Sequence, residues 1–147
     1  NRRKSLNVKL IAITGSIGKT TTKDFLSSIL SKKFSCYANV GNYNNKFGVP
    51  LSLSQIPKKT EYVIQEMGMS SKGEIKLLSK LTHPDIAIIT EIGGSHLGNF
   101  KSIDEIAKAK AEIYSGLQSS GTAIINADDA YADFWINSCK EIKVRFY

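Results

Sequence analysis

Apolar and polar positions alternate along this chain with two different periods. Short apolar runs predict strands at residues 9–13, 35–38, 62–65, 86–90, 122–125 and 142–146. Apolar residues at helical spacing predict helices at residues 19–32, 72–81, 102–117 and 129–138. Because strands and helices follow one another in turn, the pattern predicts an α/β fold with a mostly parallel sheet and helices on both of its faces.

The longest stretch without a predicted element covers residues 39–59. We expect a loop here that contains only a short apolar turn at residues 51–53. Loops of this length in compact domains are usually functional. No internal repeat, low-complexity segment or interdomain linker is evident elsewhere, so residues 1–147 are expected to form one domain.

Residues 14–22, of sequence TGSIGKTTT, join the first predicted strand to the first predicted helix. Gly15 and Gly18 can adopt dihedral angles closed to other residues and can expose their N–H groups to an anion. Together with the N-terminus of the following helix, these donors are typical of a phosphate site. Lys19 supplies a positive charge for the outer phosphates, and the Thr20 hydroxyl can ligate Mg²⁺. The segment therefore predicts a P-loop for a nucleoside triphosphate.

This loop is shorter than the common pattern G-x-x-x-x-G-K-[ST]. Ile13 stands where that pattern has its first glycine, and the chain instead has T-G-x-x-G-K-T-T. The alternative is a glycine-rich turn that carries an exposed lysine. The strand and the helix on either side favour the phosphate site.

Composition narrows the classes of ligand. The chain of 147 residues is 41% hydrophobic, which is enough for one domain with a core. Its 20 Lys and Arg residues against 13 Asp and Glu residues give a net charge of +7. Because these charges are scattered, without a basic stripe that contains aromatic residues, a small polyanion is favoured over nucleic acid.

The cysteines and the lengths of the apolar runs indicate the cellular compartment that we expect for this protein. Cys36 and Cys139 are too few for a disulfide scaffold, and neither belongs to a CxxC pair. We interpret both as buried thiols in a reducing compartment. No signal peptide is visible, and no apolar run approaches the ~20 residues that span a bilayer. We expect a cytoplasmic protein without membrane insertion.

Two further side chains follow predicted strands. Glu66 comes directly after the strand at residues 62–65, and His96 follows the strand at residues 86–90 after a glycine pair. Because ligands of open α/β sheets bind at the carboxyl ends of the strands, Glu66 can share a magnesium ion with Thr20. The alternatives are a solvated or helix-capping glutamate and a polar surface histidine; His83 is interpreted as the latter.

Lys110 falls within the apolar face of its predicted helix. At 100° per residue from Ile103 that face contains Ile106, Ala107, Ile113, Tyr114 and Leu117, whereas Lys108 points outward. Burial disfavours a charged lysine, and a neutral amine can react with carbon dioxide to form a carbamate, which is an anionic metal ligand. The alternative is a side chain that extends to the surface.

Several motifs together resemble the ATP-binding central domain of the Mur ligase family. The resemblance covers essentially the whole chain. Residues 13–23 are similar to ITGSxGKTTTK, residues 41–50 to GNxNNxxGVP, residues 66–75 to ExGxxxxGEI and residues 95–113 to xHLxxFxSxxxIAxAKxEI. Residues 126–129 also fit the family's NADD.

The resemblance implies roles for individual residues. ATP phosphates would be bound by Gly15, Ser16, Ile17, Gly18, Lys19, Thr20 and Thr21. Thr20 and Glu66 would hold a first Mg²⁺, and His96 with a carbamylated Lys110 would serve a second. Asn42 and Asn45 would line the nucleotide and acceptor side of the cleft, with the contacts of Asn42, Asn44 and Asn45 left unassigned.

The same resemblance implies an activity. It is the ATP-dependent addition of D-alanyl-D-alanine to UDP-N-acetylmuramoyl-tripeptide in peptidoglycan precursor synthesis, through an acyl phosphate. The family's uridine-nucleotide domain and carboxyl-terminal domain are not recognisable here, so we expect a truncated central domain that is inactive in isolation. Two alternatives stay open: another Mur-type or folylpolyglutamate synthase-like ligase, and a nucleotide-binding module without catalysis.

Overall fold

The computed structural model describes residues 7–93, 98–139 and 142–147 of the chain. In chain order its elements are β1 (Lys9–Thr14), α2 (Lys19–Leu30), β2 (Cys36–Ala38), α3 (Gly48–Gln55), β3 (Tyr62–Glu66), α4 (Glu74–Thr82), β4 (Ile86–Ile89), α5 (Ile103–Ala111), the 3₁₀ helix η1 (Glu112–Gly116), β5 (Thr122–Ile125), α6 (Ala132–Ser138) and β6 (Lys143–Phe146). No helix among these residues is long and apolar enough to cross a membrane.

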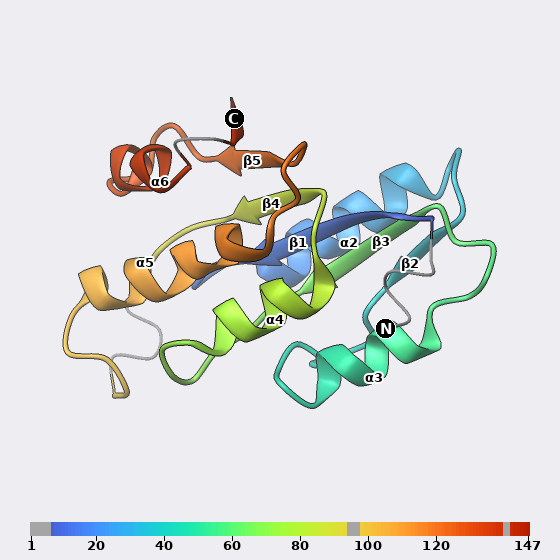
Figure 1. Ribbon diagram of the computed structural model, residues 1–147, viewed down its shortest axis with the longest axis horizontal. Coiled ribbons are helices and arrows are strands. Elements are labelled where there is room, and N and C mark those ends of the chain that lie inside the picture. Colours follow the sequence, from blue (N-terminus) through green and yellow to red (C-terminus); the bar gives the residue numbers. More distant parts are fainter. Residues whose placement is uncertain (1–6, 94–97, 140–141) are drawn as a thin grey trace.

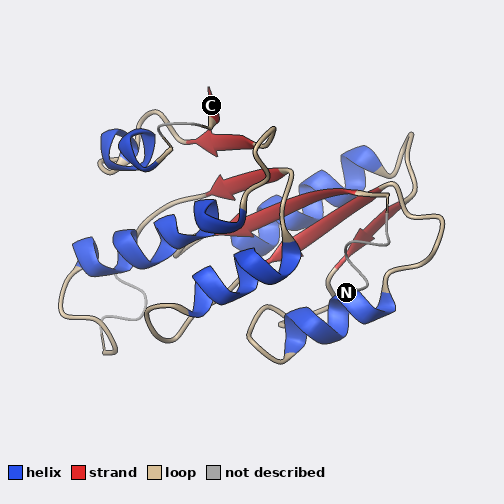
Figure 2. Ribbon diagram, in the orientation of Figure 1, coloured by secondary structure: helices blue, strands red, loops and turns tan. Residues whose placement is uncertain are grey.

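The strands form one sheet in the order β2-β3-β1-β4-β5-β6 (Figures 1 and 2). Every neighbouring pair is parallel, which confirms the predicted α/β class. β1 lies in the middle, between β3 and β4. The strand order therefore reverses around β1, and its carboxyl end is where an open sheet of this kind leaves a crevice for a ligand.

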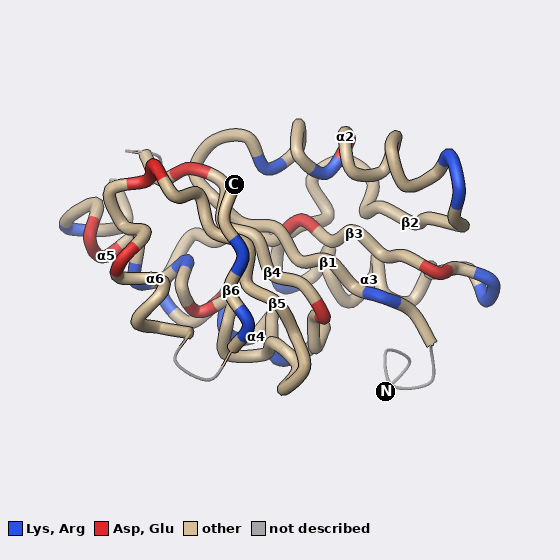
Figure 3. Tube along the Cα trace, turned by 90° about the horizontal axis from the view of Figure 1, so that it is seen from above, with Lys and Arg blue, Asp and Glu red and all other residues tan. Residues whose placement is uncertain are grey.

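The central strands are apolar because helices cover both of their faces. Leu10 and Ala12 of β1 belong to a large core that also contains Leu78 of α4 and Ile106 of α5. Ile11 and Ile13 of the same strand point to the other face, where they belong to a smaller cluster that packs against Leu26 and Leu30 of α2. Figure 3 shows α2 on one side of the sheet and α4 on the other, with the Lys and Arg positions spread over several elements.

The prediction of a loop at residues 39–59 is wrong in part, since residues 48–55 form the helix α3. Pro50 is tolerated because it lies in the first turn, where an N–H has no partner within the helix. The Asn45 side chain accepts hydrogen bonds from the N–H groups of Phe47 and Gly48 at 3.0 and 2.9 Å. Val49, Ser52 and Leu53 are buried at helical spacing. Capping and burial stabilise a sequence of weak helix formers.

Other boundaries differ in smaller ways. The helix predicted at residues 102–117 ends as an α-helix at Ala111 and continues as η1. The helices predicted to begin at residues 72 and 129 begin at Glu74 and Ala132. Both cysteines are free, and Cys139 is buried as expected, but Cys36 is partly exposed because β2 is an edge strand.

Candidate functional site

The loop between β1 and α2 is built around two glycines with positive φ, 153° at Gly15 and 82° at Gly18. A Cβ atom at Gly15 would lie 1.9 Å from Thr90 Oγ1, just beyond β4. The Thr90 hydroxyl donates to the Ile17 carbonyl at 2.6 Å, and the Ser16 N–H donates to the Glu91 carbonyl at 2.7 Å. The β1–α2 loop is therefore hydrogen-bonded to the residues that follow β4, and no space is left for a side chain at position 15.

The first turn of α2 faces an open cavity of about 800 Å³, with Gly18, Lys19, Thr20 and Thr21 on one wall. Gly18 is the N-cap residue, and no side chain among the described residues caps the helix. Because first-turn N–H groups have no acceptor within a helix, they are available to an anion. A glycine cradle, free N–H donors and a cavity of this size fit the phosphates of a nucleotide.

Lys19 and Lys110 both reach the carbonyl oxygen of Gly15. Lys19 Nζ lies 2.9 Å from it and also 3.3 Å from the Ser16 carbonyl, and Lys110 Nζ lies 2.8 Å from it. The predicted burial of Lys110 is confirmed, since only 1% of the residue is exposed. Its burial, and secondarily the charge of Lys19, lower the pKa of Lys110 to about 7. A substantial neutral fraction at physiological pH follows.

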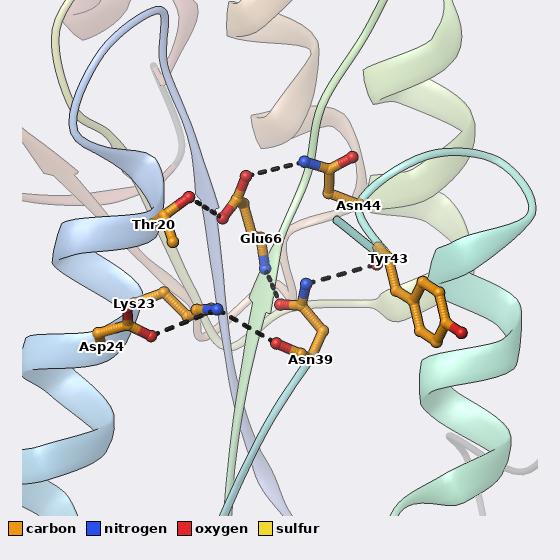
Figure 4. A network of polar contacts seen from close by, with 7 residues as sticks. All are labelled: Thr20, Lys23, Asp24, Asn39, Tyr43, Asn44 and Glu66. Atoms are coloured by element: carbon orange, nitrogen blue, oxygen red, sulfur yellow. Dashed lines mark hydrogen bonds and ion pairs between the residues drawn. The ribbon is translucent and has the colours of Figure 1, made fainter. Parts of the chain in front are cut away.

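Glu66 lies at the carboxyl end of β3 and is only 3% exposed. Its two carboxylate oxygens accept different hydrogen bonds, 2.9 Å from the Thr20 hydroxyl and 2.8 Å from Asn44 Nδ2 (Figure 4). The expected meeting of Thr20 and Glu66 is thus present. Hydroxyl and carboxylate oxygens are the ligands that Mg²⁺ prefers, so this donor set fits that ion.

The opposite wall of the cavity comes from the β2–α3 loop and from the segment before α4. It includes Asn44, Asn45, Lys46 and Phe47, and farther along Glu74. The pKa of Glu74 is lowered, mainly by the hydrogen bond that its carboxylate accepts from the Ser70 N–H. The charge of Lys46 also lowers this pKa, whereas burial raises it. This wall therefore presents the amides of Asn44 and Asn45, the cation of Lys46 and the carboxylate of Glu74 to the first turn of α2.

The other sequence-predicted residues are placed as follows. Asn45 lines the cavity but uses its side-chain oxygen to cap α3. Asn42 is exposed and does not line the cavity. His96 lies outside the described residues. Within residues 7–93, 98–139 and 142–147, no group of three or more His, Cys, Asp and Glu side chains gathers as a metal site would.

Three residues around the site were not singled out from the sequence: Lys23, Asn39 and Thr90. Lys23 Nζ donates to the Asn39 carbonyl at 3.2 Å, and the Asn39 side chain accepts from the Glu66 N–H at 2.8 Å. For Lys23 a signal existed, because it follows Thr20 by one helical turn and shares its face. For Asn39 and Thr90 no local pattern predicts these contacts, since they depend on neighbouring strands.

Residues 13–147 match the family model described as Mur ligase middle domain. The chain belongs to the Mur ligase family. Among curated relatives, the UDP-N-acetylmuramoyl-tripeptide--D-alanyl-D-alanine ligase of Bacillus subtilis is 46% identical over 124 residues, which make up 84% of this chain and 27% of the relative.

Solved structures of Mur ligases agree with this assignment. A crystal structure of MurF from Acinetobacter baumannii superposes with a TM-score of 0.96 at 39% identity and covers 99% of this chain. MurF ligase from Thermotoga maritima, solved in complex with ADP, has a TM-score of 0.89 at 31% identity and also covers 99% of this chain. The chain spans 32% and 34% of those two Mur ligases.

Proposed function

We propose that this chain is the ATP-binding part of a ligase that adds D-alanyl-D-alanine to UDP-N-acetylmuramoyl-tripeptide. The observation that carries the proposal is the 2.9 Å contact between Thr20 and Glu66 at the mouth of an uncapped P-loop helix. The contact joins a hydroxyl and a carboxylate, the kinds of group that ligate Mg²⁺, where the outer phosphates of a bound nucleotide are proposed to lie. The name of the Bacillus subtilis relative supports the choice of substrates.

In this proposal the residues from Gly15 to Thr21 bind the phosphates of ATP. The N–H groups of the loop and of the first turn of α2 donate to phosphate oxygens, and Lys19 turns from the Gly15 carbonyl toward the outer phosphates. A phosphate is a stronger partner for an ammonium group than a neutral carbonyl is. The positive end of α2 adds to the attraction.

Magnesium, when bound, neutralises charge on the transferring phosphoryl group and so brings two anionic reactants together. Thr20 and Glu66 are the proposed ligands of a first ion. His96 and Lys110 are proposed for a second, with Lys110 carbamylated. The lowered pKa of Lys110 supports this modification, because the neutral amine is the form that reacts with carbon dioxide.

The proposed reaction needs positioning more than proton transfer by side chains. A carboxylate oxygen of the substrate bonds to the γ-phosphorus and ADP leaves, which gives an acyl phosphate. The amine of D-alanyl-D-alanine then attacks the acyl carbon, phosphate leaves and the amine loses a proton. The loop N–H groups and Lys19 stabilise the charge on the departing oxygens. Asn45, which lines the cavity, is proposed to lie on the nucleotide and acceptor side of the cleft; Asn42 lies outside the cavity and is proposed for that side only in the longer protein.

The test uses the longer protein that carries this chain. We expect it to form the D-alanyl-D-alanine adduct when supplied with ATP and the UDP-muramoyl tripeptide, and absence of product would overturn the assignment. Calorimetry with Mg-ATP provides a second measurement. Lys19→Ala should weaken binding, and equal affinity before and after the substitution would contradict the phosphate site. The 147-residue chain alone is expected to bind nucleotide without completing the ligation, as a nucleotide-binding module.

Lys110 has its own test. Lys110→Ala should abolish ligation in the longer protein, and short carboxylic acids should restore part of the activity by replacing the carbamate. Full activity without any such addition would contradict the carbamate. Loss of activity that no acid restores would assign Lys110 a role as an amine instead.

A further inference from the structure

Asn39 occupies an unusual position in the sheet. β2 pairs with β3 up to Ala38 and Ile64, and the Asn39 N–H still donates to the Ile64 carbonyl at 3.2 Å. In a regular parallel ladder the Glu66 N–H would donate next to the backbone carbonyl of residue 39. It donates instead to the side-chain oxygen Oδ1 of Asn39, at 2.8 Å. The side chain thus replaces its own main-chain carbonyl in the ladder.

The displaced carbonyl of Asn39 has another partner. Lys23 Nζ donates to it at 3.2 Å and lies 3.3 Å from Oδ1 of the exposed Asp24. Lys23 itself is only 5% exposed. A buried ammonium group needs such acceptors, because an unpaired one would be strongly disfavoured. Lys23 therefore holds the backbone of Asn39 in the orientation that frees its side chain for Glu66.

This arrangement connects α2 to Glu66 in two ways, and Figure 4 shows both of them. The Thr20 hydroxyl contacts the Glu66 carboxylate directly. One turn later on the same helix, Lys23 reaches the Glu66 backbone through Asn39. Contacts to both the carboxylate and the main-chain N–H of Glu66 consequently hold this residue at a fixed distance from Thr20.

The exchange of side chain for carbonyl also explains how a cavity can open beside Glu66. After Asn39 the chain leaves the sheet and forms the loop that carries Asn44, which lines the cavity. The side-chain nitrogen Nδ2 of Asn39 donates to the Tyr43 carbonyl of that loop at 3.5 Å. Without Asn39 Oδ1, departure of the strand would leave the Glu66 N–H without an acceptor next to the cavity.

We propose that Asn39, held by Lys23, is a positioning residue that sets the orientation of Glu66 for magnesium. The inference rests on the proposed function only in assigning the metal to Glu66 and Thr20. Groups of this kind, which orient a metal ligand without touching the metal, typically change metal affinity by roughly 10–100-fold when removed.

The first test needs no nucleotide or metal. Amide hydrogen exchange of Glu66 is measured in the longer protein and in its Asn39→Ala and Asn39→Asp variants. The alanine variant should exchange at this amide at least roughly tenfold faster, because the acceptor is lost. The aspartate variant keeps an acceptor oxygen beside Lys23 and should retain protection. Unchanged exchange in the alanine variant would overturn the proposed hydrogen bond.

The second test measures the Mg²⁺ concentration that gives half-maximal ATP turnover. Asn39→Ala should raise this concentration by roughly tenfold or more, while kcat at saturating Mg²⁺ stays near wild type. Asn39→Asp should restore most of the affinity. A lower kcat at all Mg²⁺ concentrations, with an unchanged Mg²⁺ requirement, would indicate a merely structural role and overturn the proposal.

Glu61→Ala is the matched control. Glu61 Oε2 accepts from the Ser35 N–H at 2.9 Å, at the opposite end of the same strand pair. Its removal should leave both the Glu66 exchange and the Mg²⁺ requirement unchanged, and equal effects of the two substitutions would count against a local role for Asn39. If the wild-type protein shows no Mg²⁺-dependent turnover of ATP, the proposed function fails, whereas the exchange result still decides the hydrogen bond of Asn39.

Discussion

Lys19 and Lys110 meet at a single acceptor, the carbonyl oxygen of Gly15, at 2.9 and 2.8 Å. Two ammonium groups at one neutral oxygen repel each other, and Lys110 is the more buried of the pair. Burial, with a smaller contribution from Lys19, lowers the pKa of Lys110 from 10.5 to about 7. The protonation of Lys110 therefore couples the P-loop to the stability of the fold.

The first prediction concerns the pH dependence of unfolding. Between pH 7 and 10.5 the unfolded chain binds a proton at Lys110 that the folded chain does not bind. The contribution of Lys110 to the free energy of unfolding should therefore rise with pH in this window, by at most about 1.4 kcal/mol per pH unit. Urea unfolding of the wild type and of Lys110→Met at several pH values, in buffer freed of carbon dioxide so that Lys110 carries no carbamate, measures the difference. In the methionine variant this rise should be absent.

Below pH 7 both states carry the proton, so the difference between the two proteins should become constant. Lys108→Met is the control, because Lys108 lies on the exposed side of the same helix. A pH profile that Lys110→Met leaves unchanged, or one that falls between pH 7 and 9, would contradict a neutral buried lysine.

A second prediction follows from the contact between Gly15 and Thr90. A methyl group at position 15 would overlap Thr90 Oγ1 and would also require a positive φ. Gly15→Ala should lower the free energy of unfolding by about 1–3 kcal/mol and weaken nucleotide binding. Thermal unfolding and calorimetry provide the measurements.

Gly41→Ala measures what an alanine at positive φ costs where it adds no steric contact. Gly41 has a positive φ of 52°, but nothing lies within 4 Å of a Cβ built there. The alanine at position 41 should therefore cost less than the one at position 15. Equal losses of stability in the two variants would contradict a cost that is specific to the contact with Thr90.

Much of the site could be predicted from the sequence because it depends on regular periods. The helical repeat alone placed Lys110 on a buried face, and the structure confirms its burial. Parallel strands bring their carboxyl ends to one edge, which is why Glu66 was expected beside the P-loop, and it contacts Thr20 there. The metal-binding roles of these residues stay predictions.

What the sequence did not predict depends on contacts between distant segments. α3 contains Gly48, Pro50 and two serines, so its helix propensity is poor, and it is stabilised by the Asn45 cap and by burial. The role of Asn39 arises where β2 parts from β3, and strand pairing leaves no periodic signal of such a point. Local patterns therefore predicted the site's main side chains but missed those that orient them.

A third prediction separates the two proposed ligands of the first magnesium ion. Thr20→Val keeps the volume but removes the oxygen, and Glu66→Gln keeps an acceptor for the Thr20 hydroxyl while removing the charge. Each should raise the Mg²⁺ concentration needed for ATP binding by roughly 10-fold or more. Thr22→Val is the control, since Thr22 lies on the same helix but does not line the cavity. A Mg²⁺ requirement that is the same in all four proteins would exclude this pair as ligands.

The last prediction concerns the hydrogen bonds that stabilise the opposite wall of the cavity, at the start of α4. Both carboxylate oxygens of Glu112, in η1, lie 3.0–3.1 Å from the Gly73 nitrogen, and one lies 3.2 Å from the Lys76 nitrogen. Glu112 thus caps α4 from a distant segment, and its charge also suits the positive end of that helix. Glu112→Ala should cost about 1 kcal/mol of unfolding free energy, and Glu112→Gln should cost less because it keeps an acceptor.

Lys76→Ala distinguishes this cap from a surface charge pair. It removes the lysine side chain but keeps the backbone N–H that donates to Glu112, so chemical denaturation should find it close to wild type. Glu74 of the same first turn lines the cavity. Loss of the Glu112 cap should therefore also increase amide exchange at residues 73–76, where the N–H groups of Gly73 and Lys76 lose their acceptor. Unchanged exchange there would mean that water replaces the carboxylate at no cost and that the cap does not stabilise this wall.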